Sequence, residues 1–210
     1  MFFEYGETEI NFLKSRDEKL AAAIDKIGHV YREVEEDLFS TVVRTVVGQQ
    51  ISGKAQKTVL DRMENFFGQI TPEKIFETDR GKLRSFGMSF RKVECIKNFA
   101  EKISSGEFDL AAVEKMPDDD ATEYISSLKG CGVWTAEMVL IFCLRRKNIF
   151  SFTDGGIIRG LKILYSLDKV SRKTFEIYRE KFSPYCTIAS FYLWEIAGGK
   201  LSEKEGVEDF

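Results

Sequence analysis

Apolar residues recur at intervals of three and four along most of this 210-residue chain, and only three prolines interrupt them. Such spacing places apolar side chains on one face of an α-helix. The segment 37–47 has Leu38 and four valines on one face, and the segment 89–104 has Val93, Ile96 and Phe99 there. The sequence therefore predicts an all-α fold in which each of these faces points into a core.

Glycine and short polar residues mark the expected helix ends. A left-handed C-cap costs glycine least, and a polar side chain at the N-cap bonds the first amides of a helix. The glycines expected at or just past helix ends are Gly28, Gly68, Gly87, Gly106, Gly130 and Gly132. The expected N-caps are Asp17, Thr71, Asp118 and Ser171.

Composition limits the class of protein. A hydrophobic content of 43% is enough for a substantial core. No apolar run approaches the roughly 20 residues that span a bilayer, and the N-terminal stretch carries acids where a signal peptide carries basic residues. We expect no membrane partner and a cytoplasmic location, associated with the nucleoid if the source is prokaryotic. The last residues, SEKEGVEDF, are expected to form a frayed acidic tail.

Charge and cysteine spacing exclude further classes. The net charge of −3 gives no sign of a general nucleic-acid binder, so any such surface is local. The four cysteines stand far apart and lack the close pairs that hold zinc or an iron-sulfur cluster. We interpret them as buried thiols and expect no such cluster.

A very short loop, Leu128-Lys129-Gly130-Cys131-Gly132, separates helical patterns at 118–128 and 133–144. Glycines at alternate positions let the backbone turn sharply, and the second helix begins at once with its amides facing outward. A helix N-terminus of this kind attracts anions. The loop predicts either a phosphate site or an αα-hairpin whose glycines serve only the turn.

Asp154 stands at the start of another helix, after the apolar connector 149–152 and before Gly155 and Gly156. As an N-cap it has an ordinary structural role. The glycines that follow leave room for a bulky group to approach the carboxylate. A structural cap and a functional acid are both open at this point.

Together these segments resemble the helix-hairpin-helix superfamily of base-excision DNA glycosylases. The hairpin LKGCGVWTAEMVLIF and the acid in FSFTDGGIIRGL carry the resemblance, and VVGQQISGKAQ, FGMSFRKVECIKNFA and SPYCTIASFYLWEIA match in order, from about residue 38 to 197. The resemblance implies one glycosylase domain over 1–210, with the active site in a cleft between two helical lobes. Lobe A spans about 38–149 as a six-helix bundle with the hairpin at 118–145, and lobe B comprises 1–37 and 150–210.

Trp134 indicates the subfamily. Superfamily members that cut the DNA strand carry a Schiff-base lysine at this position, whereas GVWTA resembles the 3-methyladenine DNA glycosylase II family. The resemblance implies a monofunctional enzyme of base excision repair that flips alkylated purines out of the duplex and hydrolyses their N-glycosidic bond, without lyase activity. Lys129 and Ser151 replace usual prolines and Gly155 replaces a larger residue, which leaves the pocket shape open.

The resemblance also assigns site residues. Asp154 is the catalytic acid, expected to stabilise an oxocarbenium-like sugar. Trp134, Tyr185 and Tyr192 are expected to wall the base pocket, because aromatic rings attract a cationic base. Gln50, Ser52 and Phe90 are the gap and wedge candidates, and a core position for Phe90 or an internal hydrogen bond for Gln50 is the alternative. The expected phosphate contacts are Gly130, Gly132, Val133, Thr135, Lys54, Arg91, Lys129 and Arg159.

The partner implied is double-stranded DNA with damaged bases, bound by a monomer. A monovalent Na⁺ or K⁺ ion at the carbonyls of Gly130 and Gly132 is a family feature, and no other cofactor is expected. Two alternatives are a glycosylase for oxidised or deaminated bases and a non-catalytic hairpin protein that binds damaged DNA. The acid at 154 together with the aromatic residue at 134 argues against the non-catalytic binder.

Overall fold

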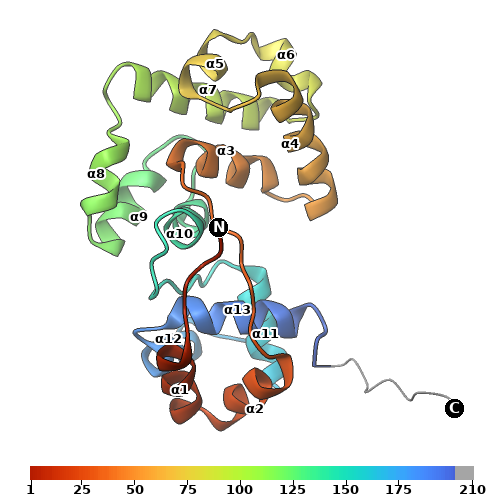
Figure 1. The fold of residues 1–210 in the computed structure, drawn as a ribbon, viewed down its shortest axis with the longest axis vertical. Helices are drawn as coiled ribbons and strands as arrows, with labels where there is room; N and C mark the ends of the chain where they lie inside the picture. Colours follow the sequence, from red (N-terminus) through yellow and green to blue (C-terminus); the bar gives the residue numbers. More distant parts are fainter. Residues whose placement is uncertain (202–210) are drawn as a thin grey trace, which may run out of the picture. The chain divides into compact units, whose positions relative to one another are not determined.

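The computed structural model describes residues 1–201, which form α-helices joined by loops (Figure 1). Within these residues the one β-type pairing is an isolated antiparallel bridge between Phe2 and Glu33. The prediction of an all-α fold is confirmed. No helix in this part of the chain is both long and apolar enough to cross a membrane. The acidic tail expected at 202–210 lies outside the described residues.

The chain divides into two compact units. Unit 1 comprises Met1–Val34 and Arg145–Phe210, and unit 2 comprises Glu35–Leu144. The helices of unit 1 are α1 (Glu7–Arg16), α2 (Glu18–Ile27), α11 (Gly155–Tyr165), α12 (Arg172–Phe182) and α13 (Cys186–Ala197). Those of unit 2 are α3 (Leu38–Gly48), α4 (Gly53–Phe67), α5 (Pro72–Glu77), α6 (Arg80–Ser85), α7 (Phe90–Ser104), α8 (Leu110–Lys115), α9 (Asp118–Ser126) and α10 (Val133–Phe142).

Unit 2 is built around α3, which packs against α4, α7 and α10 (Figure 1). The predicted apolar face of α3 is buried, and the rings of Phe39 and Phe99 stack at 5.1 Å between α3 and α7. The sequence predicts six helices in this lobe, and the structure has α3 to α10. Three of these eight helices, α5, α6 and α8, have only six residues each, so an apolar period gives little sign of them in the sequence.

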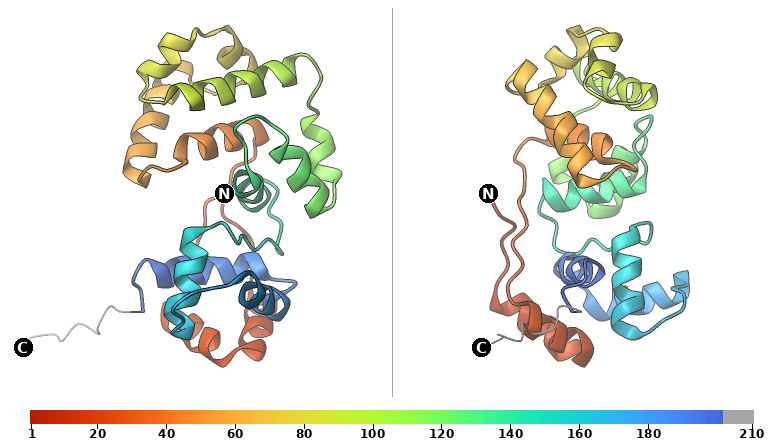
Figure 2. Two further views of the ribbon diagram at one scale, coloured as in Figure 1. Left: turned by 180° about the vertical axis from the view of Figure 1, so that it is seen from behind. Right: turned by 90° about the vertical axis from the view of Figure 1, so that its right-hand side faces the viewer.

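Unit 1 is built around α13, which contacts α11, α2 and α12. Figure 2 shows these neighbours of α13 from two further sides. Every residue from Cys186 to Leu193 is buried. A helix that is apolar on all sides is stable only when other elements enclose it, so α13 forms the core of this unit.

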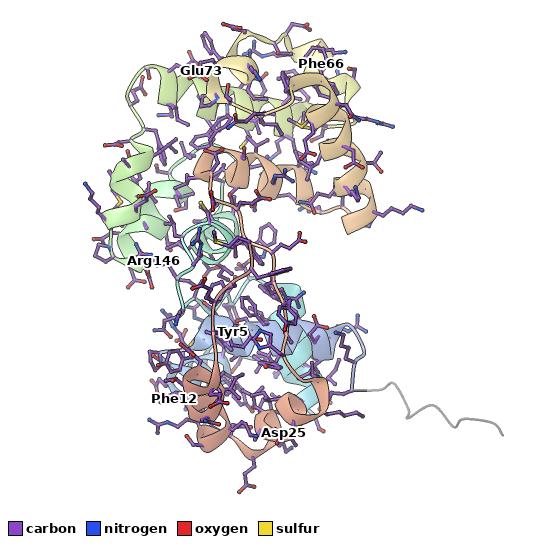
Figure 3. The ribbon with its side chains drawn as sticks, viewed as in Figure 1. Tyr5, Phe12, Asp25, Phe66, Glu73 and Arg146 are labelled. Atoms are coloured by element: carbon purple, nitrogen blue, oxygen red, sulfur yellow. The ribbon has the colours of Figure 1, made fainter. Side chains whose placement is uncertain are left out.

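Two extended segments of unit 1 are joined side by side. The amide of Phe3 donates to the carbonyl of Arg32 at 2.8 Å. The Tyr5 hydroxyl, labelled in Figure 3, accepts from the Val30 amide and donates to the Val30 carbonyl, each at 2.9 Å. These bonds hold the segment before α1 against the segment after α2.

Glycines allow α11 and α13 to pack backbone against backbone. A β-carbon on Gly160 would lie 2.3 Å from the carbonyl oxygen of Leu193, and one on Gly156 would lie 2.7 Å from Cδ1 of Trp194. Residues four apart share a helix face, so both glycines belong to the same contact. This contact brings the start of α11 against Trp194.

Most of the predicted helix ends are confirmed. Asp17, Thr71 and Ser171 accept amide hydrogen bonds as N-caps. Asp118 was wrong as an N-cap, because Pro117 takes that place and Asp118 opens an acidic first turn that suits the helix dipole. Gly132 was wrong as a helix stop, since it is the N-cap of α10 at a φ of −92°. The other five glycines named as stops have positive φ.

Candidate active site

Asp154 begins α11 as its N-cap and is only 8% exposed. Its Oδ1 atom accepts a hydrogen bond from the amide of Ile157 at 2.8 Å. The structural role expected from sequence is therefore present. A carboxylate held in a nearly buried position by fixed donors is also suited to stabilise a positive charge that develops beside it. The cap and the catalytic role are compatible.

Trp194 on α13 holds the same carboxylate oxygen. Its indole Nε1 donates to Oδ1 of Asp154 at 2.9 Å. The guanidinium of Arg32 lies 5.7 Å from the centre of the Trp194 ring and pairs with Glu195. Our sequence reasoning missed Trp194. The available signal was that an indole N–H in an apolar helix needs an acceptor, but the sequence does not say which acceptor it meets.

Thr187 on α13 anchors the connector that leads to Asp154. Its hydroxyl donates to the carbonyl of Arg146 at 2.7 Å and accepts from the amide of Ile149 at 3.0 Å. Its own amide donates to the carbonyl of Lys147 at 3.0 Å. Arg146, whose carbonyl accepts the bond from the Thr187 hydroxyl, is labelled in Figure 3. Helix α13 therefore fixes both the beginning of the connector and, through Trp194, the acid at its end.

The predicted hairpin lies in unit 2 between α9 and α10. Gly130 adopts a φ of 91°, and the amide of Cys131 donates to the carbonyl of Leu128 at 2.9 Å to close the turn. Gly132 is the N-cap of α10, and no side chain caps that helix. The start of α10 is therefore an N-terminus that an anion could cap.

Gln49, at the end of α3, binds the hairpin from the side. Its Nε2 donates to the carbonyl of Gly130 at 3.2 Å and to the hydroxyl of Thr135 at 3.0 Å. Thr135 is 1% exposed, so its side chain serves this internal contact. The residue predicted from sequence is the neighbouring Gln50, and Gln49 was not predicted. Nothing local distinguishes the two glutamines.

We expect Gln49→Ala to loosen the hairpin. The carbonyl of Gly130 and the hydroxyl of Thr135 both lose a donor, so the free energy of unfolding should fall by about 1–2 kcal/mol. Urea denaturation measures this loss. Gln69→Ala, at an exposed position of the same unit, is the matched control and should change little. Equal stability of the two variants would contradict the role given to Gln49.

The carbonyls of Gly130 and Gly132, where the resemblance implies a monovalent ion, each accept one hydrogen bond and keep a second lone pair, so the ion stays a prediction. The carbonyl of Gly130 accepts from Gln49, and that of Gly132 accepts from the amide of Ala136 at 3.1 Å within α10. Among residues 1–201 no cluster of three or more His, Cys, Asp or Glu side chains could hold a metal. The four cysteines, which lie within this range, are buried and unbridged, as expected.

The three aromatic pocket candidates differ in exposure. Trp134, in the first turn of α10, and Tyr185, the N-cap of α13, are half-buried. Tyr185 meets Phe12, labelled in Figure 3, edge to face at 5.2 Å. Tyr192 is 1% exposed. Its burial is the main cause that raises its pKa, and the nearby Tyr5 hydroxyl raises the pKa further. Trp134 belongs to unit 2 and the tyrosines to unit 1, so their meeting in one pocket stays a prediction.

The gap and wedge candidates lie at the surface, and so do most of the phosphate candidates, Thr135 being buried. Phe90 is the first residue of α7 and is 56% exposed, so the alternative of a core position is wrong. Gln50 is exposed with a φ of 56°, and Ser52 caps α4 through the amide of Ala55. The remaining phosphate candidates are all exposed, namely Lys54, Arg91, Lys129, Val133 and Arg159.

Helix α9, the glycine turn and helix α10 form a helix-hairpin-helix motif, which defines the helix-hairpin-helix class of proteins. The family model for "HhH-GPD superfamily base excision DNA repair protein" matches residues 43–184. The chain therefore belongs to the HhH-GPD superfamily of base excision DNA repair proteins, and the resemblance found in the sequence is confirmed.

Individual relatives extend the comparison over nearly the whole chain. DNA-3-methyladenine glycosylase 1 of Schizosaccharomyces pombe is 31% identical over 166 residues, which cover 77% of this chain and 73% of the relative. The structure of a DNA-3-methyladenine glycosidase from Bacillus halodurans is 32% identical, with a TM-score of 0.82 over 97% of this chain and 95% of that one. The S. pombe 3-methyladenine DNA glycosylase in complex with abasic DNA is 28% identical, with a TM-score of 0.85 over 95% of this chain and 100% of that one.

Proposed function

We propose that this protein is a monofunctional DNA glycosylase that hydrolyses the bond between an alkylated purine and its deoxyribose in double-stranded DNA. The observation that carries the proposal is the Asp154 carboxylate, held by Ile157 and Trp194 in a chain whose relatives are named 3-methyladenine glycosylases. Purines of the 3-methyladenine and 7-methylguanine type are the substrates. The enzyme acts as a monomer in the cytoplasm.

Asp154 acts on the sugar. As the base leaves, C1′ becomes oxocarbenium-like, and a carboxylate about 4 Å away contributes about 4 kcal/mol at an effective dielectric constant near 20. That energy corresponds to roughly a thousandfold in rate. The same carboxylate orients the attacking water as a base. An alkylated purine already carries a positive charge, so it leaves without a strong general acid.

The exposed residues of unit 2 handle the duplex. Moving a base out of the duplex stack costs a few kcal/mol of free energy, and an apolar side chain wedged between the remaining bases offsets part of that cost. Phe90 has the exposure that a wedge requires, and Gln50 and Ser52 supply polar groups for the gap. The uncapped start of α10 binds a phosphate through backbone amides. Lys54, Arg91 and Lys129 add positive charge in this unit, and Arg159 adds positive charge on α11 of unit 1.

Half-buried aromatic residues receive the base. Trp134 and Tyr185 retain ring surface to attract a cationic purine, at roughly 0.5–2 kcal/mol each. Tyr192 has almost no exposed surface, so we infer that it acts by packing within unit 1. No amine stands at position 134, which favours hydrolysis without a Schiff base.

Trp194 is a positioning residue in this mechanism. Trp194→Phe keeps the ring but removes the donor to Asp154, and one hydrogen bond to a charged group is worth about 1.5–3 kcal/mol. We expect the single-turnover rate of base release to fall about 10- to 150-fold with unchanged affinity for abasic DNA. Tyr31→Phe, at an exposed position of the same unit, is the control. A wild-type rate in Trp194→Phe would remove this role.

The test of the function is incubation with methylated duplex DNA followed by chromatography of released bases. We expect 3-methyladenine or 7-methylguanine to appear, and borohydride to trap no covalent complex. Release from duplexes with oxidised or deaminated bases instead would assign the other lesion class. Tight binding to abasic DNA without any base release would show a non-catalytic binder and end the proposal.

A further inference from the structure

Two cysteines meet beneath the hairpin of unit 2. Cys95 lies in the second turn of α7, and Cys131 lies in the hairpin loop between Gly130 and Gly132. Their sulfur atoms are 3.9 Å apart within a thiol hydrogen bond, and both side chains are buried. The mechanism proposed above uses neither thiol.

The hairpin backbone rests directly on Cys95. A β-carbon placed on Gly130 would lie 2.9 Å from both Cβ and Sγ of Cys95. That distance is too short for any real side chain, so the glycine backbone touches the cysteine with no intervening group. The Cys95 side chain therefore packs closely against the hairpin backbone at Gly130.

The two thiols differ in acidity. The hydrogen bond from Cys131, together with the charge of Arg91, lowers the pKa of Cys95 although burial acts in the opposite direction. The contact with Cys95, burial and the charge on Cys95 all raise the pKa of Cys131. Because the thiolate is the form that reacts with oxidants, we assign Cys95, which is near the positive charge of Arg91, as the sulfur that an oxidant meets first.

We propose that Cys95 and Cys131 form a redox modification site, which hydrogen peroxide converts into an intramolecular disulfide that weakens DNA binding by the hairpin. First, the Cys95 thiolate attacks one peroxide oxygen. The O–O bond breaks, hydroxide leaves, and Cys95 becomes a sulfenic acid. Then the sulfur of Cys131 attacks that of Cys95, the S–O bond breaks, and the leaving hydroxide takes the Cys131 proton as water. The two sulfurs together lose two electrons, and peroxide gains them.

Closing this bond changes the geometry of the hairpin. A disulfide holds its sulfur atoms about 2 Å apart, so the pair has to draw together from 3.9 Å. Because Gly130 rests on Cys95, this movement displaces the amides at the start of α10, where the proposed function places a phosphate. We expect affinity for an abasic-site duplex to fall about tenfold, the size of one lost charge-assisted hydrogen bond.

The experiment treats the full chain with hydrogen peroxide, blocks remaining thiols and maps the peptides by mass spectrometry. We expect a Cys95–Cys131 cross-link that dithiothreitol reverses. Fluorescence anisotropy with an abasic-site duplex should give the weaker binding in the oxidised protein and full recovery after reduction. The proposal would be overturned if both thiols could still be alkylated after peroxide treatment. It would also be overturned if the cross-link formed but the affinity for the abasic-site duplex did not change.

Matched variants separate this pair from the other cysteines. Cys143→Ala combined with Cys186→Ala keeps the pair and should oxidise like the wild type, whereas Cys95→Ala should bind DNA equally with and without peroxide. Cys131→Ala replaces Cys95→Ala if the latter fails to fold. If the reduced protein has no affinity for abasic DNA, the proposed function fails, and the peptide map alone decides whether the thiols pair.

Discussion

Asp154→Asn should reduce the single-turnover rate of base release about a thousandfold while affinity for abasic DNA survives. The substitution removes the negative charge that faces the sugar in the proposed mechanism. Asparagine is as good an N-cap as aspartate, and its amide oxygen can still accept from Ile157 and Trp194. Rapid-quench assays on a duplex with one methylated purine measure the rate, and thermal denaturation measures stability.

The control for this variant is Asp79→Asn. Asp79 also caps a helix, α6, but it is exposed and lies in unit 2. Asp79→Asn should keep the wild-type rate of base release. If only Asp154→Asn loses rate, the loss is due to the missing charge and not to a change in helix capping. Wild-type release by Asp154→Asn would end the assignment of Asp154 as the catalytic carboxylate.

Gly160→Ala should produce the largest loss of stability among single-methyl changes in unit 1. The added β-carbon would lie 2.3 Å from the carbonyl oxygen of Leu193, which is backbone and cannot rotate away. Helices α11 and α13 must then separate, and overpacking of a core contact costs typically 1–3 kcal/mol or more. Urea denaturation measures the change in the free energy of unfolding.

Gly155→Ala is the matched control in the same helix. Gly155 is the first residue of α11, and a β-carbon there meets nothing within 4 Å. The free energy of unfolding should stay unchanged or rise by about 0.4–1 kcal/mol, because alanine has less conformational freedom in the unfolded chain. If Gly160→Ala were as stable as Gly155→Ala, the close packing of α11 on α13 would be refuted.

The sequence alone was sufficient for the features set by local spacing. The apolar period predicted α3 and α7, and the residues that cap the helices at Asp17, Thr71 and Ser171 follow from their own hydroxyl or carboxylate groups. Each of these features depends on hydrogen bonds, or on the spacing of apolar side chains, between residues only a few positions apart in the sequence. The hairpin glycines and the cap at Asp154 belong to the same category, and so both were identified.

The contacts that position the site were decided by the tertiary structure. Trp194 reaches Asp154 across 40 residues of sequence, and Gln49 reaches Thr135 across 86. Cys95 and Cys131 meet because α7 carries one thiol beneath a loop that carries the other. Local spacing determines which face of a helix is apolar, but the choice of neighbour depends on how closely two backbones approach. On α11 that approach is set by Gly160 against Leu193.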